Sequence, residues 1–467
     1  MQDFNIPLNL QQLLNNDQAY HYRIIPFEKI ADGLLLKTDE DHIDGLESEL
    51  SILLGMKIKL EKDTPENITR YLSVNYRRSD SNRVSEIHYS RDFLEKILIS
   101  AKETGSSDIH FEPYEHNARV RFRLDGKLKE QFHISLDEYP IIVNKIKIRS
   151  QLDISEKRLP QDGRITVVTD FDDFDIRVSV LPTLHGEKIV LRILSKDTSH
   201  LELSSLGFTE KELKIYLDGI RKPNGIVLIS GPTGSGKTTT LYATLKKLNS
   251  PTTNILTVED PIEYTLEGIN QVQLKENIGL DFATTLRTFL RQDPDIIMVG
   301  EIRDVNTANM AIRAALTGHL VLSTIHTNSA WATVSRLIDM GIPSFLIAST
   351  LNLSVAQRLV RKLCENCKVQ QSITPDLFPT GFVIPQNLLH HYKAVGCEHC
   401  YHTGYSGRKA IYEILPIDNE LASMIKTNKL EIGDYILTKG FASFKHNTSE
   451  LIRNGITSID EVYSLLL

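Results

Sequence analysis

The chain has 467 residues, of which 41% are hydrophobic and 24% are charged. At about 100–200 residues per domain this length predicts two to four domains, and the composition is that of an ordinary globular protein. Its 53 Lys and Arg residues against 60 Asp and Glu residues give a formal net charge of −7, which disfavours nonspecific binding to nucleic acid. The N-terminus lacks the charged flank and apolar core of a secretory signal, and no uncharged apolar run approaches the roughly 18 residues that span a bilayer, so we expect a cytoplasmic protein.

The N-terminal part of the chain predicts two small domains. Residues 1–80 mix short apolar stretches with many charges and carry no motif, which predicts an N-terminal adaptor domain. The polar stretch at 75–86 has little to bury and predicts a linker. Within residues 86–195, apolar residues alternate with arginines in ARVRFRL up to Asp125-Gly126, a pattern typical of a β-hairpin. Further strands and one helical repeat there predict a second N-terminal α+β domain.

The rest of the chain predicts an α/β fold. Residues 196–205 are polar and predict a second linker. From 206 to 467, uniformly apolar runs such as GIVLIS and HLVLSTIH alternate with helical stretches. Strands of this kind are buried on both faces, so we expect a largely parallel sheet covered by helices on both sides.

A phosphate-binding loop is predicted where GIVLIS is followed by GPTGSGKTTT. The G-x-x-x-x-G-K-T pattern follows a predicted strand and opens a predicted helix, which is the context that such a loop requires. Glycines let backbone N–H groups approach phosphate oxygens, Lys237 is suited to bridging the β- and γ-phosphates, and the Thr238 hydroxyl is suited to Mg²⁺. The predicted nucleotide-binding residues are Gly231, Pro232, Thr233, Gly234, Ser235, Gly236, Lys237, Thr238 and Thr239.

Carboxylates follow the next two apolar strands. TVEDPIEY contains Glu259, Asp260 and Glu263, and DIIMVGEIRD contains Glu301 and Asp304. Side chains at the carboxyl ends of parallel strands face the ligand crevice, where they can hold Mg²⁺ through water or orient an attacking water. A glycine stands where an aspartate usually closes such a strand, so Glu301 becomes the leading catalytic carboxylate. Glu259, Asp260 and Asp304 are equally consistent with solvated loop charges or helix N-caps.

Two histidines flank the strand that comes next. His319 begins the run HLVLSTIH and His326 ends it. An imidazole at the carboxyl end of the strand is placed to contact a γ-phosphate or a carboxylate, although a lone histidine there is usually a structural hydrogen-bonding group. The position therefore favours His326 over His319.

All four cysteines of the chain lie in two CxxC pairs, Cys364 with Cys367 and Cys397 with Cys400. Two such pairs close a tetrahedral Zn²⁺ site with four thiolates and no open position, which is a structural site. The gap between the pairs is longer than the roughly 15–20 residues usual in zinc ribbons, and nearby histidines at 399 and 402 offer substitute ligands. We predict a small insertion that the metal holds together.

The ordered segments GPTGSGKTTT, ILTVEDPIEY, LRQDPDIIMVGEIRD and TGHLVLSTIHTN resemble those of the secretion ATPases of the type II secretion and type IV pilus assembly family. The resemblance runs from about residue 86 to the end of the chain and does not cover residues 1–80 convincingly. It implies a RecA-like P-loop ATPase domain at 206–467 with a zinc-binding module at about 361–412. It also implies a smaller α+β domain before it, with ATP bound between the two.

The resemblance also implies roles for the site residues. In that family the four segments act as Walker A, an aspartate box, Walker B and a histidine box. Carried over to this sequence, Lys237 binds the phosphates, Glu301 polarises water, Glu263 is a supporting carboxylate and His326 senses the γ-phosphate.

Four arginines match family arginines. Arg164 and Arg177 match those that reach the phosphates from the smaller domain, although from the sequence alone they are ordinary strand charges. Arg287 and Arg408 match arginines that line an interdomain or intersubunit cleft, and an exposed surface charge is the other interpretation.

As a whole, the resemblance implies a cytoplasmic homohexameric ATPase, peripheral at the inner membrane, that uses ATP, Mg²⁺ and Zn²⁺ and contacts inner-membrane platform and linker proteins. A short N-terminal part and the stretch GRKAIYEIL favour pseudopilus assembly for type II secretion over type IV pilus assembly. Retraction motors of the same superfamily generally lack the two CxxC pairs. The acidic balance disfavours a DNA-uptake or other nucleic-acid motor, and the joint presence of Lys237, Glu263 and Glu301 disfavours a nonenzymatic scaffold.

Overall fold

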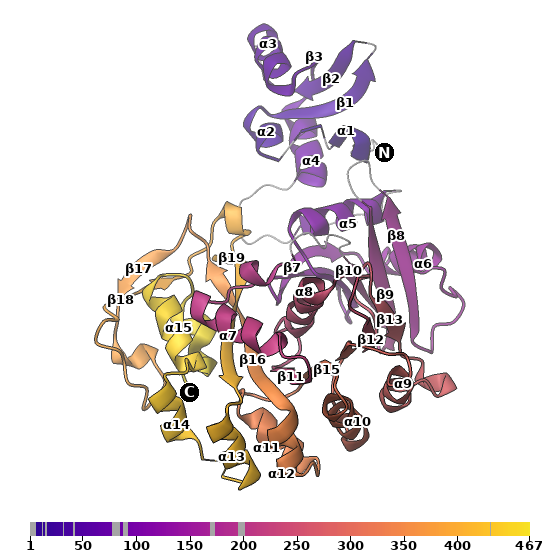
Figure 1. Cartoon of the computed structure of the whole chain (residues 1–467). Coiled ribbons are helices and arrows are strands. Elements are labelled where there is room, and N and C mark those ends of the chain that lie inside the picture. The colour runs from indigo at the N-terminus through magenta and orange to yellow at the C-terminus, as the bar shows by residue number, and fades with distance from the viewer. Residues whose placement is uncertain are drawn as a thin grey trace. The chain divides into compact units, whose positions relative to one another are not determined.

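The computed structural model divides the chain into two compact units, Met1–Ser195 and Lys196–Leu467. Each is described by itself, and Figure 1 labels their elements. The structure describes residues 6–11, 13–14, 16–30, 32–40, 43–76, 85–86, 92–168, 173–194, 201–429 and 431–467. Residues 77–84 and 196–200, which make up most of one predicted linker and half of the other, lie outside the described residues.

The first unit begins with a three-stranded sheet in the order β1-β2-β3. β1 pairs antiparallel with β2, and β2 pairs parallel with β3, so a crossover is needed and α3 supplies it. The alternation in GLLLKT buries Leu34 and Leu36 in a small core that includes residues of α1, α2 and α4. The bounds are α1 Leu8–Gln11, α2 Asn16–His21, β1 Ile24–Ile30, β2 Gly33–Thr38, α3 Ile43–Leu54, β3 Lys57–Lys62 and α4 Pro65–Asn75.

A seven-stranded sheet follows in the order β4-β7-β6-β5-β10-β9-β8. The predicted hairpin is confirmed: Leu124 of β6 pairs with Lys127 of β7 across Asp125 and Gly126, both at positive φ. One face of the sheet packs on α5 and α6 around buried residues such as Phe111 and Phe122. The bounds are β4 Ser85–Glu86, α5 Phe93–Glu103, β5 Asp108–Pro113, β6 Ala118–Leu124, β7 Lys127–Ile134, α6 Tyr139–Arg149, β8 Gln161–Val168, β9 Asp173–Thr183 and β10 Gly186–Leu194.

The second unit is built on a sheet in the order β13-β12-β14-β15-β11-β16-β19. Its neighbouring strands are parallel except for β16 and β19, which confirms the predicted α/β fold. The strand bounds are β11 Gly225–Ser230, β12 Ile255–Glu259, β13 Asn270–Gln273, β14 Ile296–Val299, β15 Leu320–Ile325, β16 Leu351–Leu363, β17 Val369–Ser372, β18 His390–Lys393 and β19 Tyr405–Pro416. The helix bounds are α7 Glu210–Ile220, α8 Lys237–Leu248, α9 Phe282–Phe289, α10 Val305–Leu316, α11 Ala332–Asp339, α12 Ser344–Thr350, α13 Asn419–Lys426, α14 Gly433–Lys439, α15 Phe444–Arg453 and α16 Ile459–Val462.

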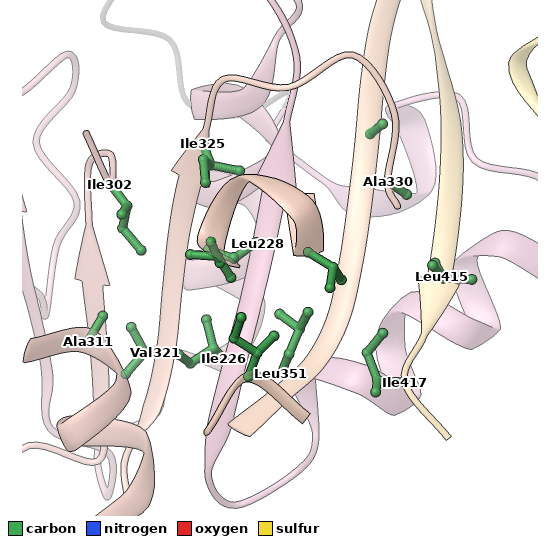
Figure 2. Packing of buried hydrophobic residues seen from close by; sticks show 14 of the residues in the cluster. Ile226, Leu228, Ile302, Ala311, Val321, Ile325, Ala330, Leu351, Leu415 and Ile417 are labelled. Atoms are coloured by element: carbon green, nitrogen blue, oxygen red, sulfur yellow. The ribbon is translucent and has the colours of Figure 1, made fainter. Parts of the chain in front are cut away.

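Helices cover both faces of this sheet, and its central strands β11, β12, β14 and β15 are buried at every position. Ile226 and Leu228 of β11 pack into a cluster with α9 to α12, and Figure 2 shows Ile226 beside Val321 of β15, its partner in the sheet register. The intervening Val227 and Ile229 pack into a second cluster with α7 and α8. Leu201 and Leu203, inside the stretch predicted as a linker, are buried in this second cluster. Among the described residues, no helix combines the length and the apolarity that crossing a bilayer requires.

Candidate functional site

The phosphate loop connects β11 to α8, as its sequence predicts. Gly236 adopts a left-handed conformation with φ of 87° and caps α8, which begins at Lys237. Gly231 lies so close to β16 that a Cβ there would sit 2.5 Å from the carbonyl oxygen of Gln357, so only glycine fits. The Ser235 hydroxyl is buried and has no hydrogen-bond partner among the described residues. This crowded loop at a helix N-terminus has the shape and the spare donors that a phosphate group needs.

The Lys237 ammonium lies over its own loop. It donates hydrogen bonds to the carbonyl oxygens of Gly231 at 2.8 Å and Pro232 at 3.1 Å. Burial lowers the pKa of Lys237, the charge of Glu301 partly offsets this, and the Arg358 guanidinium adds to it. Thr238 is exposed in the first turn of α8, where its hydroxyl is free to reach a Mg²⁺ ion bound to phosphates.

Glu301 and His326 come together at the same edge of the sheet. Glu301 follows β14 and His326 follows the neighbouring parallel strand β15, and His326 Nε2 lies 3.3 Å from Glu301 Oε2. Arg303 also hydrogen-bonds to Glu301. Burial acts to raise the pKa of the Glu301 carboxyl, but Arg303 and then His326 outweigh it, so that pKa lies below its usual value. The carboxylate is therefore ionised near neutral pH and able to accept a hydrogen bond from water.

Glu259, at the end of β12, is neither a loop charge nor a helix cap. Its carboxylate is buried and accepts hydrogen bonds from the hydroxyls of Tyr242 and Thr257 and from Gln271 Nε2. The backbone N–H of Glu263 donates to the Tyr242 hydroxyl at 3.2 Å, so the aspartate-box loop is tied to α8. The Glu263 carboxylate itself has no hydrogen bond or ion pair with any described residue.

The other acidic and histidine candidates have structural contacts. Asp304 caps α10, accepting hydrogen bonds from the backbone N–H groups of Asn306 and Thr307. His319 Nδ1 lies 2.8 Å from the carbonyl oxygen of Ala314, which holds the turn before β15. The structure thus brings His326, and not His319, to Glu301.

The predicted phosphate-binding arginines lie in one row across the sheet of the first unit. Arg164 of β8 is paired in register with Arg177 of β9, which is paired with Arg192 of β10. Arg192 is in turn opposite Asp108 and hydrogen-bonds to it at 2.8 Å, while Arg164 bonds to Asp175 at 2.6 Å. The sequence analysis missed Arg192, although the alternation in KIVLRIL placed it on this face. In the second unit, Arg287 on α9 and Arg408 on β19 are both exposed.

Two neighbouring residues of β16, Gln357 and Arg358, also lie at the phosphate loop, and no sequence motif singled them out. Gln357 Oε1 accepts a hydrogen bond from the Thr240 hydroxyl in α8 at 2.9 Å. A Cβ on Gly231 would lie 3.2 Å from Arg358 Nη1. Gln357 therefore supports the start of α8 from the strand next to β11, and Arg358 lies beside the phosphate loop without a hydrogen bond to it.

The four cysteines form one cluster. Their sulfur atoms lie within 4.8 Å of one another, and three Sγ pairs are 3.8 Å apart, close to the ~3.8 Å edge of a tetrahedron with Zn–S bonds of about 2.3 Å. Burial opposes ionisation of the Cys400 thiol, but backbone N–H groups of Cys397 and Gly404 lower its pKa to about 6. Burial raises the pKa of Cys367 to about 12, so four thiolates need a cation among them. The site is compatible with Zn²⁺, and among the described residues only cysteines belong to it.

Known proteins match the chain over most of its length. The family described as Type II/IV secretion system protein matches residues 85–464. The type IV pilus assembly ATPase PilB of Myxococcus xanthus is 39% identical over 503 residues, covering 99% of this chain and 87% of that protein. The type II secretion system protein E of Pseudomonas aeruginosa is 46% identical over 371 residues, covering 79% of this chain and 74% of that protein. The structure of the pilus retraction motor PilT with bound ADP is similar at a TM-score of 0.54 and 26% identity, covering 79% of this chain and 96% of that one.

The family match includes the residues that form the site. The phosphate loop, Glu301, His326 and the four cysteines all lie within residues 85–464. The sheet that carries them has the RecA-like architecture of the motor ATPases to which it is similar. The chain therefore belongs to the type II/IV secretion system protein family and is an ATPase.

Proposed function

We propose that this chain is the subunit of a homohexameric motor in which ATP hydrolysis drives the assembly of pilin-like subunits into a pseudopilus for type II protein secretion. The observation that carries the proposal is the contact of His326 with Glu301 at the sheet edge where the phosphate loop also lies. A bare nucleotide-binding module has no need of an ionised carboxylate held beside the phosphates. A hydrolase does, because water must be oriented for attack.

Each site residue has a distinct task in the proposed hydrolysis of ATP to ADP and phosphate. Lys237 leaves the carbonyl oxygens of its loop and binds the β- and γ-phosphates, whose anionic oxygens are stronger acceptors. Thr238 would help to hold Mg²⁺, which would screen charge on the transferred phosphoryl group. Glu301 accepts a hydrogen bond from the attacking water, and His326, in contact with Glu301, senses the γ-phosphate.

The remaining predicted residues contribute further charges to the proposed ATP site. Glu263 supports the Glu301 side of the site, and Arg164 and Arg177 neutralise phosphate charge as the family resemblance implies. Their row includes Arg192, so three arginines lie side by side on neighbouring strands. Arg164 and Arg192 already pair with Asp175 and Asp108, so a bound phosphate would compete with these carboxylates for the two guanidinium groups.

Type IV pilus assembly is a second candidate, and one observation favours it. The pilus assembly ATPase of Myxococcus xanthus matches 99% of this chain, so that match extends over the N-terminal residues, where the adaptor domain is proposed. Both candidates place the motor in the cytoplasm, peripheral at the inner membrane through platform and linker proteins. A DNA-uptake motor is less favoured because the chain is acidic.

We also propose that the four cysteines hold one structural Zn²⁺ within the module at about 361–412. The sulfur spacing fits a closed tetrahedral site, which leaves no position for a reacting ligand. The metal would therefore contribute to folding rather than to chemistry.

Replacing Lys237 or Glu301 should separate binding from turnover. Lys237→Ala should lose nucleotide binding, because the loop then lacks its only side-chain cation, whereas Glu301→Gln should bind Mg·ATP and release no phosphate above background. Binding of a fluorescent ATP analogue and release of phosphate measure the two steps. Turnover by Glu301→Gln at the wild-type rate would remove Glu301 from its proposed role.

Arg303→Ala should move the acidic limb of the ATPase pH–rate profile to higher pH. Arg303 lowers the pKa of Glu301 against the opposing effect of burial, so its loss lets that pKa rise and the ionised carboxylate then disappears at a higher pH. Arg313→Ala, an exposed arginine on the neighbouring helix α10, is the control and should leave the limb in place. If the acidic limb of the profile stays in place or moves to lower pH in Arg303→Ala, the proposed role of the ionised Glu301 carboxylate is contradicted.

Metal analysis of the purified chain should find about one zinc per chain. Cys397→Ser should lose the metal and lower the temperature of unfolding, while His399→Ala should retain it, because that histidine is outside the cysteine cluster. A metal-free wild-type chain that is stable to chelators would refute the zinc site.

Deleting the gene should decide between the candidate machines. Loss of secreted exoproteins with pili intact is expected for type II secretion, and loss of surface pili with secretion intact for type IV pilus assembly. Loss of DNA uptake alone would exclude both candidates. Complementation with Glu301→Gln shows whether the phenotype depends on hydrolysis.

A further inference from the structure

Arg358 connects the phosphate site to the loop that carries His326. Its Nη2 donates to the carbonyl oxygen of Asn328 at 2.8 Å, two residues after His326. Its Nη1 donates to the carbonyl oxygen of Gln357 at 3.0 Å, the same oxygen that packs against Gly231. Half-burial lowers the pKa of Arg358, and no carboxylate of the described residues lies within ion-pair distance. The guanidinium is thus held by one backbone carbonyl of the His326 loop and one of its own strand, β16.

The other face of Arg358 meets the C-terminal helices. Its guanidinium carbon lies 5.0 Å from the centre of the ring of Phe444, the first residue of α15. Phe444 is buried and packs in the same cluster as β11 and β15. A cation over a partly desolvated aromatic face is a favourable contact with a defined orientation. Arg358 therefore links the His326 loop to the N-terminus of α15.

Glu413 makes the same connection from the neighbouring strand. Its Oε2 accepts a hydrogen bond from the backbone N–H of Ala330 at 3.2 Å, and its Oε1 accepts one from Phe444 at 3.0 Å. Burial raises the pKa of the Glu413 carboxyl, opposed by these two N–H groups and by the charge of Arg358. One carboxylate thus holds both the end of the His326 loop and the start of α15.

Taken together, two strand residues fix both halves of a very short segment. β15 ends at Ile325 and α11 begins at Ala332, so only residues 326–331 separate the strand from the next helix. Arg358 holds Asn328, and Glu413 holds Ala330. Arg358 and Glu413 both also contact Phe444. The residues that hold the segment are therefore the same ones that contact the N-terminus of α15.

We propose that Arg358 and Glu413 are positioning residues through which α15 sets the placement of His326 against Glu301 and thereby the rate of hydrolysis. The proposal rests on the roles given above to Glu301 and His326. Neither Arg358 nor Glu413 needs to touch the nucleotide. Their effect reaches it through the His326 loop, so it should appear in turnover and not in nucleotide affinity.

The test compares Arg358→Gln with Arg361→Gln. Arg361 is on the same strand and, like Arg358, lies over an aromatic ring, that of Tyr405. It forms an ion pair with Glu461 and has no hydrogen bond to the His326 loop. We expect Arg358→Gln to lower kcat on the order of tenfold with KM changed less than about twofold, and Arg361→Gln to leave both near wild type. Arg358→Lys should recover part of kcat, because it keeps the cation but not the paired donors. Phe444→Leu, which keeps apolar volume but removes the ring face, should lower kcat in the same sense.

Trp331 reports on the segment directly. It is the only tryptophan of the chain and follows Ala330 immediately. Mg·ATPγS should change its fluorescence in the wild type and in Arg361→Gln, and this change should be lost in Arg358→Gln and Phe444→Leu while binding of Mg·ATPγS persists. A normal kcat and a normal Trp331 response in Arg358→Gln, or an equal loss in Arg361→Gln, would overturn the proposal. A different result, turnover in Glu301→Gln, would contradict the proposed function. In that case the fluorescence response of Trp331 would still show whether α15 acts on the His326 loop.

Discussion

The parallel pairing of β15 between β11 and β14 is the constraint on which the site depends. Ser230 pairs with Ile325 and Val299 pairs with Ser323, so the phosphate loop, His326 and Glu301 leave the sheet at one edge. A slip of one residue would turn every side chain of a strand to the opposite face. Because each face of β11 is buried in its own apolar cluster, such a slip would disrupt both cores. The register that places the chemistry is therefore set by packing.

Charges at that edge act on one another because the site is partly buried. Coulomb interactions strengthen as the effective dielectric constant falls, so each charge alters the protonation of its neighbours. Glu301 raises the pKa of Lys237 while Arg303 and His326 lower that of Glu301, and Arg358 disfavours a further cation at Lys237. These cations suit a substrate whose reacting end is a triphosphate.

The sequence was sufficient for residues whose role is local and insufficient for those whose partners are distant. The phosphate loop lies within one strand, one turn and one helix, so its pattern alone predicted it. Glu301 and His326 each end a recognisable apolar strand. For Glu259 the sequence left open a carboxylate facing the ligand, a loop charge or a cap, because its partners Tyr242 and Gln271 are 17 and 12 residues away and belong to other elements.

Arg358 and Glu413 show most clearly which residues the sequence could not predict. Arg358 bonds to a carbonyl 30 residues away and Glu413 to an N–H 83 residues away, and neither stands in a motif. On a strand, an isolated charged residue indicates only an exposed or edge position. What gives these two residues a role is the antiparallel pairing of β16 with β19, which brings Ala356 opposite Glu413 beside the phosphate loop. That pairing follows the long cysteine-containing insertion and has no local signal.

The same strand links the cysteine cluster to the catalytic edge. Cys364 follows the last residue of β16, Leu363, whose backbone N–H donates to the carbonyl oxygen of Ile456 at 2.8 Å. Lys368 reaches the carbonyl oxygen of Gly455 at 3.0 Å, so the start of the cysteine module also holds the turn after α15. One end of α15 is thereby tied to Arg358 and the turn beyond its other end to the cysteine module. A structural metal bound there would steady the helix that holds the His326 loop, and so influence turnover without approaching the nucleotide.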